Sequence, residues 1–198
     1  MFTDFQKLEL DHFAEMDTVH SSQDSKRVIL TFFLTWEKLF LAFIMNRCTK
    51  GAVRLIFDKL EHQLGTYDFL SLFNTILTDR GSEFGDPDSL ENGTNGIVRS
   101  NIYFCDPMRS GQKGGIEQAH TMLRMILPKK TSFEFLTQWD LRTIVDHVNS
   151  TPREILGGRT PYDVALENYG IDILKALQLR PIPPDEVNLT PKLIRFNH

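Results

Sequence analysis

The sequence predicts an α/β fold, in which a mixed five-stranded sheet is flanked by helices. Two runs of β-branched and aromatic residues, two shorter apolar segments and several stretches with helical spacing of apolar residues support this prediction. The chain has 198 residues, of which 41% are hydrophobic. It can therefore bury one substantial core, whereas a second full domain would be cramped.

The predicted strands come from five segments. Residues 28–34 and 39–44 are typical of an antiparallel hairpin, and the segment around Asp17 is expected to be the strand before them. The short apolar segments 76–77 and 102–104 are expected to be buried strands. Three consecutive strands followed by two separate ones make up the predicted sheet.

Three amphipathic helices are predicted, over residues 53–64, 115–127 and 133–148. Gly65 can end the first of them. The second has an apolar stripe that would pack on the sheet, formed by Ile116, Ala119, Leu123 and Ile126. Residues 86–96 are rich in Asp, Asn and Gly, which predicts a loop.

The chain changes in character near its C-terminal end. Thr160 can cap a short helix over 162–168, with Pro161 at its first position. Prolines in the following residues indicate an extended tail. The predicted division is therefore a core over 1–169 and a proline-containing C-terminal extension over 170–198, which would be a linker, a docking arm or an end that folds against a partner protomer.

Three acidic residues stand in contexts that suit a metal site. Asp17 lies in a predicted strand, Asp79 ends the apolar stretch 75–78, and Glu117 opens the helix predicted over 115–127. Carboxylates brought together in this way are hard oxygen ligands for Mg²⁺ or Mn²⁺, and a metal pair can activate an attacking hydroxyl and stabilise a leaving oxygen in phosphoryl transfer. The alternative is three solvated surface acids among 26 Asp and Glu residues.

Motifs around these acids follow one another over roughly residues 12–167. They are Glu15–Val19, Leu77–Phe84, Tyr103–Pro107, Gly111–Gln118, Leu127–Lys130 and Asn149–Arg153. In these motifs the chain resembles the catalytic core of DDE transposases, most closely the insertion-sequence-thirty family within the retroviral-integrase-like group. Asp79-Arg80-Gly81 alone would be a weak signal, whereas ordered blocks are specific.

The resemblance implies a ribonuclease-H-like core in which Asp17, Asp79 and Glu117 are catalytic and bind Mg²⁺ or Mn²⁺, with two ions expected. It implies a DNA transposase that cleaves a transposon end and transfers the freed 3′-hydroxyl to target DNA. Two alternatives stay open: a nuclease or recombinase of the same fold without strand transfer, and an inactive core that only binds DNA or assembles with another subunit. The implied partners are DNA, as transposon ends and target, and further copies of the chain in a homo-oligomeric active complex.

The predicted DNA contacts are four basic residues: Lys113, Arg124, Lys129 and Lys130. Residues 109–159 carry 8 bases against 5 acids, whereas residues 1–98 carry 15 acids against 9 bases. Lys113 lies in a glycine-rich loop from which it could reach a phosphate, and Arg124 follows Glu117 by two helical turns on the same face. The alternatives are a solvated loop lysine and a surface arginine that pairs with a helix neighbour.

Composition bears on partners and location. Because the net charge is −4, we expect the chain by itself to bind DNA weakly. The two cysteines lack CxxC spacing, which indicates reduced thiols, and the six histidines form no HxxxH or HxH pair, which argues against a zinc site. No apolar run approaches the about 20 residues needed to span a bilayer, and no signal-peptide pattern is visible. We therefore expect no membrane partner. The expected location is the bacterial cytoplasm, with association with the nucleoid when the protein is active.

Overall fold

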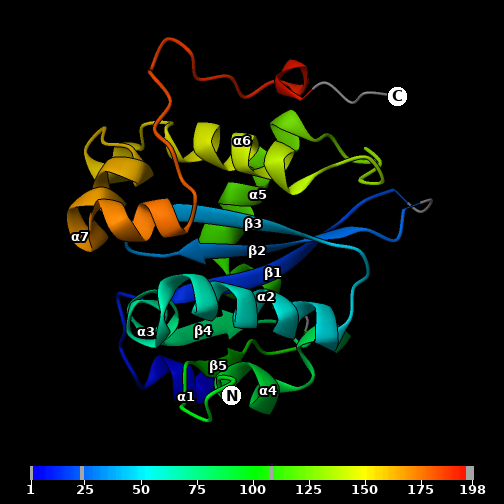
Figure 1. Ribbon diagram of the computed structural model, residues 1–198, viewed down its shortest axis with the longest axis vertical. Helices are drawn as coiled ribbons and strands as arrows, with labels where there is room; N and C mark the ends of the chain where they lie inside the picture. Colours follow the sequence, from blue (N-terminus) through cyan, green and yellow to red (C-terminus); the bar gives the residue numbers. More distant parts are fainter. Residues whose placement is uncertain (1, 23–24, 108, 195–198) are drawn as a thin grey trace.

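The structure, a computed structural model, describes residues 2–22, 25–107 and 109–194 and is built around one five-stranded sheet (Figure 1). The strands are β1 (Ala14–His20), β2 (Val28–Leu34), β3 (Leu39–Met45), β4 (Thr75–Thr78) and β5 (Asn101–Phe104). They lie in the order β3-β2-β1-β4-β5. The predicted mixed five-stranded sheet is confirmed.

The sheet is antiparallel on one side of β1 and parallel on the other. Strands β1, β2 and β3 form an antiparallel meander in which Asp17 lies opposite Thr31. Strand β4 runs parallel to both β1 and β5, and such pairs need a crossover connection. All seven residues of β2 are buried, which explains its almost unbroken apolar sequence.

Helices follow and connect the strands. Their bounds are α1 (Phe2–Gln6), α2 (Lys50–Leu64), α3 (Thr66–Phe73), α4 (Pro87–Glu91), α5 (Gly114–Ile126), α6 (Gln138–Asn149) and α7 (Pro161–Ala176). As predicted, Gly65 follows the last residue of α2 and Thr160 caps α7, where it forms a capping box with Asp163. Within the described ranges, no helix combines the length and the hydrophobicity needed to cross a bilayer.

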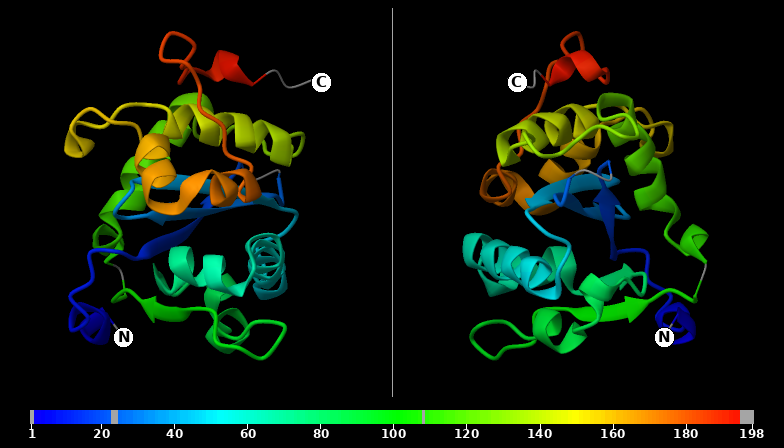
Figure 2. Two further views of the ribbon diagram at one scale, coloured as in Figure 1. Left: turned by 60° about the vertical axis from the view of Figure 1, so that its left-hand side comes forward. Right: turned by 90° about the vertical axis from the view of Figure 1, so that its right-hand side faces the viewer.

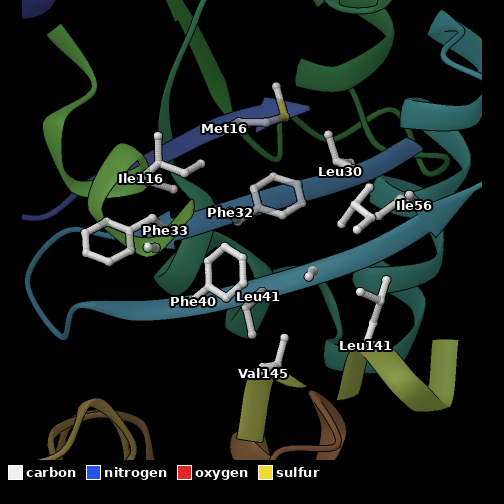
Figure 3. Packing of buried hydrophobic residues seen from close by; sticks show 14 of the residues in the cluster. Met16, Leu30, Phe32, Phe33, Phe40, Leu41, Ile56, Ile116, Leu141 and Val145 are labelled. Atoms are coloured by element: carbon white, nitrogen blue, oxygen red, sulfur yellow. The ribbon is translucent and has the colours of Figure 1, made fainter. Parts of the chain in front are cut away.

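Helices cover both faces of the antiparallel strands. Helices α5 and α6 pack on one face and α2 and α3 on the other, as the rotated views in Figure 2 show. Neighbouring side chains of β2 therefore enter different layers of the core (Figure 3). The Phe32 ring lies 5.6 Å from that of Phe57 on α2 and 5.1 Å from that of Phe73 on α3, between ring centroids. Phe33 instead contacts the first turn of α5 at Gly115.

The helix predicted over 133–148 begins later than expected. It starts at Gln138, because the Thr137 side chain accepts a hydrogen bond from the Asp140 backbone while the Asp140 carboxylate accepts one from the Thr137 backbone. Residues 133–136 therefore precede the helix, although Phe133 and Leu136 are buried, as the apolar pattern indicated.

The predicted loop over 86–96 contains the short helix α4. Pro87 stands at its first position, where the fixed φ of proline favours a helical turn. The fully buried guanidinium of Arg99 donates to the backbone oxygen of Leu90 at 2.9 Å and pairs with Glu61 of α2 at 2.9 Å. This buried arginine joins the segment to α2, and its role was not visible as a local pattern.

The described part of the C-terminal tail lies along α6. Helix α7 continues beyond the predicted 162–168 to Ala176, with a kink at Gly170, where φ is 80°. Three backbone N–H groups of the tail donate to side chains at the end of α6 and just after it: Arg180 to Asp146 (2.9 Å), Ile182 to Ser150 (2.9 Å) and Asn188 to His147 (3.1 Å). Residues 195–198 lie outside the described ranges, and the division between 1–169 and 170–198 stays a prediction.

Candidate active site

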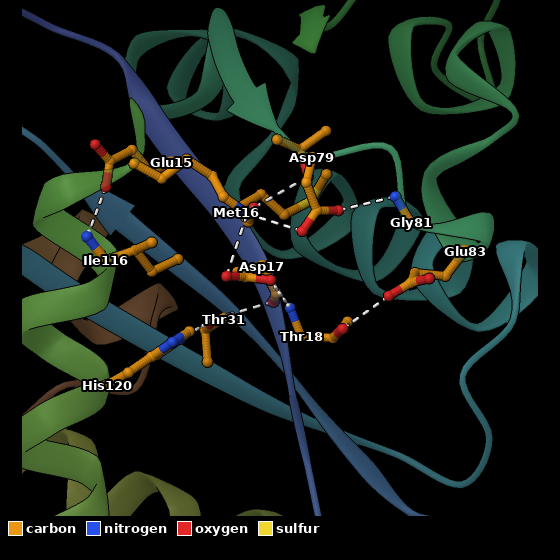
Figure 4. A network of polar contacts seen from close by, with 12 residues as sticks. Glu15, Met16, Asp17, Thr18, Thr31, Asp79, Gly81, Glu83, Ile116 and His120 are labelled. Atoms are coloured by element: carbon orange, nitrogen blue, oxygen red, sulfur yellow. Dashed lines mark hydrogen bonds and ion pairs between the residues drawn. The ribbon is translucent and has the colours of Figure 1, made fainter. Parts of the chain in front are cut away.

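The site begins where strands β1 and β4 part. Their parallel pairing spans only Ala14–Glu15 and Ile76–Leu77. The next carbonyl on β1, that of Met16, instead accepts a hydrogen bond from the hydroxyl of Thr78 at 3.0 Å. Asp17 and Asp79 follow this point on the two strands, and Figure 4 shows their carboxylates beside the Met16 backbone.

Lys113 joins the two aspartates. Its ammonium lies 3.1 Å from Asp17 Oδ2 and 3.2 Å from Asp79 Oδ2, and it donates to the carbonyl oxygen of Met16 at 3.3 Å. The lysine side chain is 1% exposed, whereas that of Asp79 is 46% exposed. One buried cation is thus held by three oxygens from two strands.

This position bears on both interpretations of Lys113. Its side chain is 1% exposed, so the alternative of a solvated loop lysine is wrong, whereas the contact with a phosphate stays a prediction. Two carboxylates offer the ammonium a stronger partner than water does, so the side chain turns inward. The backbone of Lys113 also accepts a hydrogen bond from Glu117 N at 3.4 Å, which places the lysine directly before α5.

Glu15 fixes the start of α5. Its carboxylate accepts a hydrogen bond from Ile116 N at 2.5 Å, so it satisfies one of the free N–H groups of the first turn. Burial raises the pKa of Glu15, while the backbone N–H groups of Ile116 and Gly115 and the charge of Lys113 act in the opposite direction. A side chain at Gly115 would place its Cβ 2.4 Å from the ring of Phe33, so only glycine allows α5 to approach the sheet this closely.

Glu117 lies one residue after that anchored turn. Glu117 is exposed, and Lys113 forms its ion pairs with Asp17 and Asp79 and not with Glu117. Asp17 and Glu117 nevertheless act on a common neighbour, because both negative charges favour the protonated form of His120. The structure therefore brings Asp17 and Asp79 together on one cation and places Glu117 on the adjoining helix.

His120 connects α5 to the strand beside β1. The Thr31 hydroxyl donates to the backbone oxygen of Asp17 at 3.0 Å, so its oxygen accepts from His120 Nε2 at 2.8 Å (Figure 4). Burial lowers the pKa of His120 from 6.5 to about 4, against the opposing charge of Asp17. A neutral imidazole thus holds α5 against the backbone of the first aspartate.

The turn after Asp79 is fixed by its own carboxylate. Asp79 Oδ1 accepts a hydrogen bond from Gly81 N at 2.8 Å. A Cβ at Gly81 would lie 2.7 Å from Glu83 Oε2 and 3.1 Å from Asp79 Oδ1. The absence of a side chain at Gly81 allows the turn to pass close to the carboxylates of Asp79 and Glu83.

Arg124 is less free than the sequence indicated. Its guanidinium donates to the backbone oxygen of His20 at 2.8 Å and to that of Leu127 at 3.4 Å, and it lies 5.9 Å from the centroid of the Phe133 ring. Burial lowers the pKa of Arg124. Arg124 thus contacts the end of β1 and the segment before α6 as well as its own helix, and its contact with DNA stays a prediction.

The remaining two predicted DNA contacts, Lys129 and Lys130, are exposed after the end of α5. Sequence reasoning missed Glu15 and His120. Two signals point to them: Glu15 lies two residues before Asp17 on a strand, and His120 lies four residues after the buried Ile116 on a helix, so each shares a face with a residue already identified.

Parts of the chain are similar to transposases of insertion sequences. No protein-family model matches the chain. Over 93 residues it is 36% identical to the transposase for insertion sequence element IS1086 of Cupriavidus metallidurans, a match that covers 47% of this chain and 26% of that protein. Over 63 residues it is 35% identical to transposase InsI for insertion sequence element IS30A of Escherichia coli K12, covering 32% of this chain and 16% of that protein.

A solved structure shares the fold. The catalytic core domain of BIV integrase superposes with a TM-score of 0.54 at 20% sequence identity, over 80% of this chain and 96% of that chain. The predicted ribonuclease-H-like core is confirmed, and so is the resemblance to insertion-sequence transposases, that of IS30A among them. The matched segments span well under a third of the length of either transposase.

Proposed function

We propose that this chain is the catalytic core of a DNA transposase, which cleaves DNA at a transposon end and joins the freed 3′-hydroxyl to target DNA. The observation that carries the proposal is the convergence of Asp17 and Asp79 on one cation, beside the helix that bears Glu117. The similarity to the IS1086 and IS30A transposases supports the same class of reaction, polynucleotidyl transfer.

The donor set fits a hard divalent cation. The Lys113 ammonium stands where two carboxylate oxygens and one carbonyl oxygen already meet around a positive charge, and Mg²⁺ and Mn²⁺ favour oxygen ligands of this kind. Asp17, Asp79 and Glu117 would hold the metal, with two ions expected. When bound, such a pair supplies activation of the attacking hydroxyl and stabilisation of the leaving oxygen.

Lys113 would then have a second role. Its ammonium and a divalent cation held by Asp17 and Asp79 would repel each other. Directly before α5, the lysine would be positioned to pair with a DNA phosphate. This exchange reconciles the buried position of Lys113 with the predicted phosphate contact.

The rest of the site positions the acids. Glu15 holds the first turn of α5 against β1, which sets the position of Glu117. His120 and Thr31 tie the same helix to the backbone of Asp17. These contacts hold the acids in place, and Arg124, Lys129 and Lys130 on the basic segment would bind phosphates of DNA that lies across the exposed side of Asp79. We expect the active complex to contain several copies of the chain bound to transposon ends and target.

A joining assay tests the proposal. The purified protein is incubated with Mn²⁺ or Mg²⁺, supercoiled plasmid and a labelled DNA duplex that carries a free 3′-hydroxyl. We expect label to appear in the plasmid with the wild-type chain and not with Asp79→Asn, because the amide keeps the Gly81 contact and removes the negative charge. Asp88→Asn, at an exposed acid on α4, is the matched control and should join DNA as the wild type does.

The products separate the alternatives. Plasmid nicking without joining would indicate a nuclease or recombinase of the same fold that lacks strand transfer. DNA binding without nicking or joining would indicate an inactive core. Equal activity of Asp79→Asn and the wild type would remove Asp79 from the catalytic set.

A further inference from the structure

A second group of potential metal ligands lies on the other face of β1. The side chains of a strand alternate, so Thr18 and His20 point away from the face that carries Glu15 and Asp17. His20 ends β1, Cys48 lies just before the α2 cap Thr49, and Glu83 lies in the 3₁₀ turn Ser82–Phe84 that follows Asp79. Three separate parts of the chain thus meet at one place.

The ligand atoms of His20, Cys48 and Glu83 all lie within 4.8 Å of one another. Ligands of one tetrahedral zinc ion, with Zn–S of about 2.3 Å and Zn–N of about 2.0 Å, are about 3.5 Å apart. His20 is exposed, so its ring has room to move towards Cys48 and Glu83.

Glu83 supplies an independent observation. Glu83 as a whole residue is 8% exposed, and within residues 2–22, 25–107 and 109–194 no lysine or arginine forms an ion pair with it. It accepts a hydrogen bond from the Thr18 hydroxyl at 2.7 Å, as Figure 4 shows. A buried carboxylate held by neutral donors, beside a thiol and an imidazole, lacks the cation that such burial normally requires.

We propose that His20, Cys48 and Glu83 bind one zinc ion, or a transition-metal ion of similar chemistry, at a site separate from the carboxylates of Asp17 and Asp79. Sulfur and imidazole ligands favour Zn²⁺ over Mg²⁺, so the two sites select different metals. The Thr18 hydroxyl orients the Glu83 ligand from outside the coordination shell. Three protein ligands leave the fourth position to water.

The zinc ion holds together the segments that border the active site. It joins the end of β1, three residues after Asp17, to the turn that follows Asp79 and to the segment that precedes α2. The proposed site does not depend on whether the chain transfers DNA strands. The spacing of the histidines in the sequence did not predict this zinc site, because each of its three ligands comes from a different segment of the chain.

Cobalt substitution tests the site directly. The purified chain is stripped of metal with a chelator, and Co²⁺ is added in the presence of excess Mg²⁺, which saturates the carboxylate site. We expect one equivalent of Co²⁺ to produce the thiolate-to-cobalt charge-transfer absorption in the near ultraviolet and the strong visible bands of four-coordinate cobalt. One equivalent of Zn²⁺ should abolish both signals by displacement and raise the Tm.

Matched variants identify the ligands. Cys48→Ala should lose the charge-transfer band and the rise in Tm with Zn²⁺, whereas Cys105→Ala, which removes the other thiol, should keep both. Glu83→Gln should weaken binding at least tenfold, and Glu117→Gln should not change it. Circular dichroism shows whether each variant is folded. A wild-type chain without the band, a band that persists in folded Cys48→Ala, or one lost in Glu117→Gln would overturn the proposal.

Discussion

Lys113 is the residue on which the charge balance of the site depends. Its ammonium is the single cation within 4.0 Å of the Asp17 and Asp79 carboxylates among the described lysines and arginines. Without it, two negative charges would face each other where the strands part. The chain can therefore fold with these two acids neutralised from within, and a metal bound by them as proposed would replace the ion pairs of Lys113.

Removing this ammonium should make folding depend on metal. We expect Lys113→Met to lower the free energy of unfolding by about 1–3 kcal/mol in EDTA, below the usual cost of breaking a buried ion pair because Asp79 is partly exposed. Added Mg²⁺ should restore most of this loss, since the metal replaces the missing charge. Thermal unfolding with and without Mg²⁺ measures both effects.

The control is Lys129→Met, which removes an exposed lysine and should leave the unfolding temperature nearly unchanged. If Lys113→Met is as stable as the wild type in EDTA, the ammonium does not compensate the aspartates.

Arg124 should matter for stability as well as for DNA. Arg124→Ala removes the hydrogen bond to His20 and the contact with Phe133, and we expect a loss of about 1–2 kcal/mol in unfolding free energy. Arg124→Lys should recover only part of it, because one ammonium cannot reproduce the guanidinium fork. Chemical denaturation measures stability, and the joining assay below the melting temperature measures function. Unchanged stability of Arg124→Ala would show that these contacts contribute nothing.

The acids were predictable from sequence, whereas their environment was not. Asp17 lies in a strand expected before two apolar runs and Asp79 ends an apolar stretch, and neighbouring strands of one sheet can bring such positions together. The residues that contact them are distant in the sequence: Lys113 is 34 residues from Asp79 and 97 residues from Met16. No local pattern shows that a loop lysine will turn inward, because the reason lies in carboxylates elsewhere in the chain.

At the scale of elements, the link between α5 and β2 should respond to acid. Because burial lowers the pKa of His120 to about 4 from 6.5, the unfolded chain binds more protons between these values. The contribution of neutral His120 to the free energy of unfolding is complete above pH 6.5. It decreases by about 3 kcal/mol as the pH falls towards 4. Asp146 acts oppositely: burial raises its pKa to about 6, so its contribution is lost as the pH rises towards 6.

The variant His120→Gln isolates the histidine. It keeps an amide donor for Thr31 and removes the titrating ring. Without metal, the difference in unfolding free energy between wild type and variant should shrink as the pH falls from 6.5 to 4, while Asp146 affects both alike. A difference that is constant with pH would mean that His120 does not lose stability through protonation.

Elements with a strong local signal were predicted well. The strands 28–34 and 39–44 and the helix near 115–127 lie within one or two residues of β2, β3 and α5. Helix α3 was missed because it follows Gly65, which signals an end and not a new beginning. Helix α4 was missed because Pro87, which favours its first turn, lies in a segment predicted to be a loop. The start of α6 was placed too early because the apolar run before it hid the capping residue Thr137.

At the scale of the whole molecule, net charge opposes DNA binding. We expect the chain alone to bind duplex DNA with a Kd above about 1 μM at physiological salt, and a plot of log affinity against log salt concentration no steeper than about −4, as four phosphate contacts allow. Fluorescence anisotropy over a salt series measures both. The double variant Lys129→Ala/Lys130→Ala should reduce the slope by about 2. Nanomolar affinity at physiological salt would contradict the prediction.

The brief pairing of β1 with β4 has a consequence for the order in which the candidate site forms. The meander β1–β2–β3 is made of contacts between neighbouring strands, which form early, whereas Met16 and Thr78 are 62 residues apart when they meet. Loop-closure entropy delays such distant contacts. We therefore expect Asp17 to lie on a formed meander before Asp79 is brought beside it, so the proposed cleavage of DNA would require the distant contact between β1 and β4 as well as the local ones.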